Sequence, residues 1–154
     1  MKLGAALAEL KSRQSQLARL IQIRQDTMDY ESNKKPKMDA KELTEQINTM
    51  IDDIRKLKLQ IMKTNLETEL STGITLSEAI IKIGDLRSKI ANYHQLVKYE
   101  RDRYSFFEGE RKTKDVIPQV EEKKIEEEIK KLNEEKLKLD NEIQQANWKV
   151  DLKG

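Results

Sequence analysis

The chain has no cysteine, one histidine, two prolines and five glycines among its 154 residues. Without cysteine it can form no disulfide, no thiol nucleophile and no thiolate zinc site, and with a single histidine any metal site would rest on carboxylates. Scarce glycine and proline exclude barrels and sandwiches, which need frequent tight turns, and glycine-rich phosphate-binding loops. No apolar run is long enough for a secretory signal or a membrane span. We therefore expect a cytoplasmic protein with no cofactor, no metal and no catalytic residues.

What the chain has in abundance is charge. Charged residues make up 38% of the sequence, yet the formal net charge is only +2, because 30 basic residues nearly balance 28 acidic ones. Alanine, glutamate, lysine, leucine and arginine together account for about half of the residues, a composition typical of long helices and coiled coils. The one clear charge bias is a basic N-terminal quarter, residues 1–38.

Apolar residues recur at alternating steps of three and four along most of the chain, the spacing of one helix face. This periodicity predicts an all-α fold, an elongated antiparallel bundle of about four long helices with coiled-coil-like packing, as a single domain over residues 1–154. Turn-forming and charged stretches separate the periodic segments. The predicted helices lie near 2–25, 39–70, 76–104 and 119–147, with connectors at 26–38 and 105–118.

The helix predicted over 39–70 carries two sets of apolar residues. Its main seam is Leu43, Ile47, Met50, Ile54, Leu57 and Ile61, and beside this seam lie Ile51, Leu59, Met62 and Leu66. An apolar surface wider than one seam indicates a helix that contacts more than one neighbour. The helix predicted over 76–104 likewise carries Ile80, Ile81 and Leu96 beside its seam, so we expect both helices to contact more than one neighbour.

Local signals mark where two of the helices begin. Asp39 followed by Glu42, and Thr75 followed by Glu78, have the spacing of capping boxes, in which side chains satisfy the first backbone N–H groups. Gly73 is expected to close the preceding helix, because glycine readily adopts the left-handed conformation found at helix ends.

Three groups of residues, in order along the chain, carry a resemblance to a known family. They are Ile61–Asn65 with Gly73–Ala79 and Asp85–Arg87, then Arg101–Ser105, and finally Ile143–Gln144 with Asn147–Trp148 and Asp151–Leu152. In these stretches the chain resembles a small bacterial family whose members are called septicolysin or classed as a domain of unknown function. The resemblance spans nearly the whole chain and implies a helical fold and a bacterial cytoplasmic setting. It implies no particular biochemical activity.

Polar residues within these stretches form a candidate cluster. Guanidinium, carboxylate and phenol groups together could bind an anion in a pocket, or could form a structural network that fixes the register between helices. We favour the structural interpretation, because neighbouring helical residues point in different directions. The candidate cluster consists of Asn65, Asp85, Arg87, Arg101, Arg103 and Tyr104, and the candidate interface residues are Phe106, Phe107 and Trp148.

The sequence therefore predicts a non-enzymatic helical protein that forms a homo-oligomer or binds a protein partner. A membrane-active, cytolysin-like protein is an alternative, because the first helix is basic and has an apolar face. Weak nucleic-acid binding through the basic N-terminal region is a second alternative. The first helix has no aromatic anchor and the net charge is small, so we expect neither a membrane nor a nucleic acid to be the partner.

Overall fold

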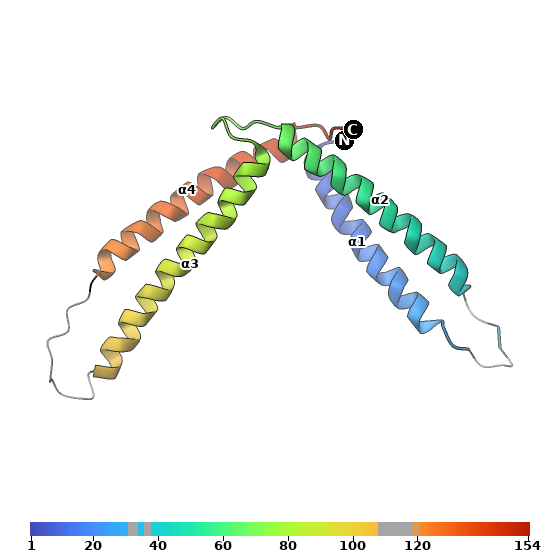
Figure 1. The fold of residues 1–154 in the computed structure, drawn as a ribbon, viewed down its shortest axis with the longest axis horizontal. Helices are drawn as coiled ribbons and strands as arrows, with labels where there is room; N and C mark the ends of the chain where they lie inside the picture. The colour runs from blue at the N-terminus through green and yellow to red at the C-terminus, as the bar shows by residue number, and fades with distance from the viewer. Residues whose placement is uncertain (31–33, 36–37, 108–118, 120) are drawn as a thin grey trace. The chain divides into compact units, whose positions relative to one another are not determined.

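A computed structural model describes residues 1–30, 34–35, 38–107, 119 and 121–154, and for residues 99–107 it describes the backbone alone. The described residues form four α-helices, which Figure 1 labels in chain order. The predicted all-α bundle is confirmed. The helices are α1 (Leu3–Asp26), α2 (Ala40–Glu67), α3 (Leu76–Phe107) and α4 (Glu122–Lys149).

The predicted helix boundaries differ from the observed ones by three residues at three ends, and by at most two residues elsewhere. Helix α2 ends at Glu67 rather than near residue 70, because Thr68 has an extended backbone with φ −98° and ψ 116°. Helix α3 continues to Phe107, so the connector predicted over 105–118 begins too early. Helix α4 begins at Glu122 rather than 119, and the Glu121 carbonyl accepts hydrogen bonds from the backbone N–H groups of Lys124 and Ile125, one turn later in the chain.

Gly73 closes a turn and not a helix. The backbone N–H of Gly73 donates to the carbonyl of Leu70, the N–H of Leu70 donates to the carbonyl of Ile74, and Gly73 itself has φ 79°. A turn followed by a left-handed glycine is a common hairpin connection. The predicted left-handed glycine is therefore correct, but its role as the helix terminator is wrong.

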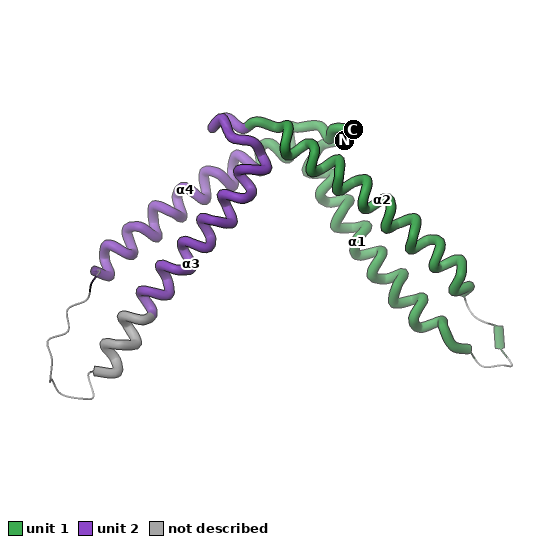
Figure 2. Tube along the Cα trace, in the orientation of Figure 1, with its two compact units in different colours: residues 1–69, 144–154 green, residues 70–143 purple. Residues whose placement is uncertain are grey.

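The chain divides into two compact units, shown in green and purple in Figure 2. The first unit contains residues 1–69 and 144–154, and the second contains residues 70–143. The prediction of a single domain over 1–154 stays a prediction.

In the first unit, α1 and α2 pack as an antiparallel hairpin. The predicted seam of α2 is confirmed, since all of its members are buried except the half-buried Met50. Helix α1 contributes fewer enclosed residues, because only Leu3 and Ala6 are buried while Leu17 and Leu20 are half-buried. One neighbouring helix cannot cover a wide apolar face, so this core is thin.

In the second unit, α3 pairs with the part of α4 that precedes residue 144. The buried residues come from both helices: Leu76, Ala79, Ile83, Leu86, Val97, Ile125 and Leu139. Lys82 Nζ lies 2.7 Å from a carboxylate oxygen of Glu135, and Ser71 Oγ donates to Glu142 over 2.9 Å. These pairs join the start of α3 to the later part of α4, so the two helices run antiparallel.

Side-chain caps form at both predicted helix starts. The Glu78 carboxylate accepts hydrogen bonds from the backbone N–H and the hydroxyl of Thr75 at 2.7 and 2.8 Å, and the Glu78 N–H donates to the Thr75 hydroxyl at 3.2 Å. This reciprocal arrangement confirms the predicted capping box. At the start of α2, Asp39 accepts from the backbone N–H of Lys41 at 2.7 Å.

Candidate functional site on helix α2

The two ends of the chain are joined to each other and to the end of α2, as Figure 1 shows for the termini. The backbone N–H of Leu3 donates to the Val150 carbonyl, and the N–H of Leu152 donates to the Met1 carbonyl, at 2.9 and 2.7 Å. The N–H of Lys153 then donates to the hydroxyl of the fully buried Thr64 over 3.0 Å. We call residues 150–154 with these partners the terminal clasp. It holds the C-terminal half of α2 in a defined position.

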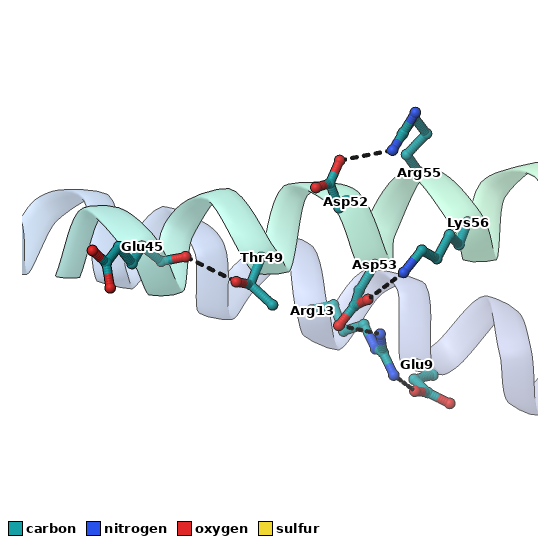
Figure 3. A network of polar contacts seen from close by, with 8 residues as sticks. All are labelled: Glu9, Arg13, Glu45, Thr49, Asp52, Asp53, Arg55 and Lys56. Carbon is teal, nitrogen blue, oxygen red and sulfur yellow. Dashed lines mark hydrogen bonds and ion pairs between the residues drawn. The ribbon is translucent and has the colours of Figure 1, made fainter. Parts of the chain in front are cut away.

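An ion-pair network crosses from α1 to α2 further along the hairpin (Figure 3). The Arg13 guanidinium pairs with Glu9 on its own helix and lies 3.8 Å from a carboxylate oxygen of Asp53. Asp53 in turn lies 3.5 Å from Lys56 Nζ. All of these side chains are at least a third exposed, so water screens the pairs and each contributes little to stability.

A groove of about 670 Å³ follows this network between the two helices. Its lining mixes charged, amide and apolar side chains: Arg13, Gln16, Leu20, Glu42, Glu45, Gln46, Thr49, Met50 and Asp53. A second groove of about 570 Å³ shares Glu42 and Gln46 and extends toward Tyr30 and Met38. A nucleophile hydrogen-bonded to a base, the usual sign of covalent catalysis, does not occur among these lining residues.

The resolved pKa shifts come from surface hydrogen bonds and not from burial. Hydrogen bonds from Lys2 and Lys82 lower the pKa of Asp151 and Glu135, respectively. A hydrogen bond to Glu128 raises the pKa of Lys131. Each shift moves the pKa of the group further from 7, whereas general acid–base catalysis needs groups whose pKa lies near the working pH. These shifts therefore report local pairing, and the prediction that the protein is not an enzyme stays a prediction.

Two other kinds of site are absent from the described part of the chain. No three of its histidine, aspartate and glutamate side chains are grouped so that they could hold a metal ion. None of its helices is both long and apolar enough to cross a membrane.

The residues of the predicted polar cluster do not converge where the structure describes them. Asn65 is half-buried on α2, while Asp85 and Arg87 are exposed on α3 and, being two residues apart, point about 200° from each other around that helix. None of these three side chains makes a hydrogen bond or ion pair with another described residue. The side chains of Arg101, Arg103 and Tyr104 lie outside the described residues, so the cluster stays a prediction.

The described structure does not test the role of the predicted interface residues. Trp148 lies on α4 with 68% of its surface exposed, so it does not anchor the C-terminal tail within the described structure. Phe106 and Phe107 are helical at the end of α3, and their side chains lie outside the described residues. Their role as contact residues for another molecule stays a prediction.

The most prominent exposed apolar surface is formed by the residues beside the buried seam of α2. Leu59, Met62 and Leu66 are 59–60% exposed and Ile51 is 46% exposed, whereas Leu57 in the seam is only 5% exposed. At about 100° per residue the four exposed side chains fall within an arc of about 80°, centred about 120° from the buried seam. We call Ile51, Leu59, Met62 and Leu66 the outer stripe; Arg55 lies in the same arc and separates Ile51 from the other three residues, which are contiguous. The sequence predicted a second neighbour for this face, and the described chain leaves it exposed.

Other exposed apolar side chains do not form a comparable stripe. Ile80 and Ile81 are adjacent on α3 and so point about 100° apart. Leu137 on α4 is 61% exposed, but the residues one turn away on either side are Asn133 and Asn141. The outer stripe of α2 is therefore the best candidate for a functional surface.

Comparison with known proteins gives a structural neighbour and a family but no assigned activity. The chain is similar to a crystal structure described as that of a functionally unknown conserved protein from Corynebacterium diphtheriae, with 26% sequence identity, 99% of each chain covered and a TM-score of 0.81. No functionally curated protein matches the chain. The matches do not refer to septicolysin, so that label stays an implication of the sequence resemblance alone. Residues 8–152 match the family of unknown function designated DUF6847, and the chain belongs to that family.

Proposed function

We propose that this protein is a non-enzymatic helical interaction protein that self-associates through the outer stripe of α2. The observation that carries the proposal is the exposure of Leu59, Met62 and Leu66, each near 60%, on consecutive turns of one helix face. Isolated apolar residues are normal on protein surfaces, but a contiguous apolar stripe commonly marks a contact with another molecule.

The expected strength of this association can be estimated from the stripe itself. Burying a leucine or methionine completely contributes about 1.5–3 kcal/mol, so the exposed part of each stripe residue still offers about 1–2 kcal/mol. Three such residues on each of two copies offer roughly 6–12 kcal/mol, against roughly 4–15 kcal/mol for the lost freedom of two associating chains. The two terms are of similar size. Association should therefore be weak and should depend on concentration.

The position of the outer stripe within the α1–α2 hairpin also supports the proposed association. The terminal clasp holds the C-terminal half of α2, which carries three of the four stripe residues. A helix that is already ordered loses less conformational freedom when it binds than a flexible segment does. The outer stripe is therefore ordered before it contacts a partner, which lowers the entropic cost of association.

Light scattering coupled to size exclusion tests this proposal. We expect the mass of the wild-type chain to rise above the monomer value of 18.1 kDa over about a hundredfold increase in concentration. The double variant Leu59→Gln with Met62→Gln should remain monomeric and should keep its helical circular dichroism, because both side chains are largely exposed.

Leu137→Gln is the matched control, because Leu137 is equally exposed but belongs to no stripe. This control should associate like the wild type. A wild-type mass that stays at 18.1 kDa at every concentration, or equal loss of association in both variants, would refute the proposal.

A further inference from the structure

Sulfur chemistry in this chain is confined to methionine. The chain has five methionines and no cysteine, so a peroxide that meets it finds thioethers and no thiol. Met50 is half-buried, whereas Met1, Met28, Met38 and Met62 are exposed. Oxidation of methionine to the sulfoxide replaces a flexible apolar side chain by a polar one. A peroxide can therefore change the polarity of four exposed positions on the folded chain.

Met62 differs from the other exposed methionines in its surroundings. It lies three residues after Leu59 and four residues before Leu66, in the middle of the contiguous part of the outer stripe. Met28, by contrast, lines a groove together with Ala40 at the start of α2, roughly 30 Å along the helix from Met62. The other stripe residues have aliphatic side chains, which peroxides leave unchanged. Met62 is therefore the stripe residue whose polarity depends on oxidation.

We propose that Met62 is a modification site at which peroxides weaken the self-association of the protein. The inference rests on the proposed contact through the outer stripe and adds the regulation of that contact. A lone pair of the Met62 sulfur attacks one oxygen of hydrogen peroxide, and the S–O bond forms as the O–O bond breaks. The departing hydroxide takes the proton of the transferred hydroxyl group, so the products are the sulfoxide and water. Sulfur loses two electrons and the peroxide gains them.

The sulfoxide affects the contact between copies rather than the fold of one chain. In the single chain 59% of the Met62 surface is exposed, so water hydrates the new S=O group. In the associated form the same oxygen is covered by apolar side chains, and a polar group buried without a hydrogen-bond partner destabilises a contact. Both copies carry Met62, so oxidation adds this penalty from each side. We expect the association to weaken at least about tenfold.

The weakness of the proposed association keeps Met62 accessible to the oxidant. Single chains with an exposed Met62 coexist with associated chains, and as single chains are oxidised, dissociation supplies more of them. Association itself covers Met62. Its oxidation should therefore become slower as the protein concentration rises, whereas the oxidation of Met28 should proceed at the same rate throughout.

Treatment with hydrogen peroxide followed by light scattering tests the inference, and peptide mass spectrometry locates each sulfoxide. Oxidised wild-type protein should carry the sulfoxide at position 62, keep its helical circular dichroism, and associate at least about tenfold more weakly than untreated protein. The two methionine sulfoxide reductases, one for each epimer, should restore the association when a dithiol is supplied as the reductant.

Two matched variants separate Met62 from the other methionines, each compared with itself before and after peroxide. Met62→Leu keeps an apolar side chain of similar size that peroxide does not change, so its association should be the same before and after treatment. Met28→Leu removes a methionine of similar exposure, 62%, that lies outside the stripe. Its association should weaken after treatment as that of the wild type does.

Three results would overturn the inference. The first is an oxidised wild-type chain that carries the sulfoxide at position 62 and associates as before. The second is a Met62→Leu variant whose association weakens after peroxide as much as that of the wild type. The third is an oxidation rate of Met62 that does not fall while the mass of the protein rises.

This inference and the proposed function fail in different ways. An untreated chain that is monomeric at all concentrations contradicts the proposed self-association, and the regulation through Met62 falls with it. An untreated chain that associates through Leu59 and Met62, but whose association survives the sulfoxide, contradicts only the role of Met62 as a modification site.

Discussion

Replacing Thr64 by valine tests whether the terminal clasp stabilises the first unit. Thr64 is fully buried, and its hydroxyl donates to the Gln60 carbonyl over 2.7 Å while accepting from the backbone N–H of Lys153 over 3.0 Å. Valine keeps the shape and branching of threonine but lacks the hydroxyl. The substitution therefore removes the hydrogen bond to the tail with little change in packing.

The expected loss in the free energy of unfolding is about 1–2 kcal/mol. A net hydrogen bond contributes about 0.5–1.5 kcal/mol, and this one is only partly buried because its donor belongs to the exposed Lys153. Loosening the tail also weakens the ion pair between Lys153 and Glu67, whose charged atoms are 3.0 Å apart. That pair is exposed on both sides, so it adds at most about 1 kcal/mol.

Thr49→Val is the matched control. The Thr49 hydroxyl donates to the Glu45 carbonyl one turn back, as the Thr64 hydroxyl does to Gln60, but Thr49 is exposed and has no contact with the tail. Its replacement should change the free energy of unfolding by no more than about 0.5 kcal/mol. The difference between the two variants therefore isolates the contribution of the clasp.

Urea unfolding and amide hydrogen exchange together provide the measurement. In the Thr64→Val variant the Lys153 amide should exchange about tenfold faster, which corresponds to about 1.4 kcal/mol. The amide of Leu152, which donates to the Met1 carbonyl, should also lose protection. If Thr64→Val is no more destabilising than Thr49→Val and the Lys153 amide stays protected, the reasoning about the clasp is wrong.

Three further predictions concern other parts of the chain. Leu57→Ala should cost about 2–5 kcal/mol in urea unfolding because the side chain is buried, whereas Leu59→Ala should change the stability of the monomer by less than about 1 kcal/mol. Equal losses would contradict the assignment of the two faces of α2. Gly73→Ala should cost about 1–2 kcal/mol because φ is 79°, and an unchanged midpoint would argue against that geometry. Hydrogen bonds from the backbone and side chain of Thr75 lower the pKa of Glu78, so the cap should be fully formed above the ordinary value of 4.5 and be lost as the pH falls through the lower folded value. An NMR titration in which the Thr75 amide shift does not follow Glu78 protonation would refute this.

The helices and their starts could be predicted because the signals for them are local. The seam of α2 follows from residues three and four positions apart, which necessarily share a face of the helix. The cap formed by Thr75 and Glu78 depends on a spacing of three residues. Each of these features needs only the nearby chain, and each is confirmed.

The candidate site was only partly predictable. The sequence separates the outer stripe of α2 from the seam and indicates that this face needs a neighbour. The sequence does not indicate which helix or molecule covers this face, because periodicity shows that a face is apolar but not what packs against it. The polar cluster was proposed from residue types and from the family resemblance, and Asp85 and Arg87 point in different directions on an exposed part of α3.

The sequence by itself determined the helical periodicity, the apolar seams and the helix caps, since these depend on contacts within a few residues of chain. Only the tertiary structure decided that Lys2 meets Asp151, that Thr64 accepts from Lys153, and that the outer stripe is left exposed. These features depend on segments far apart in the sequence coming together. No local pattern encodes such a meeting, because it is the packing of whole helices that selects it.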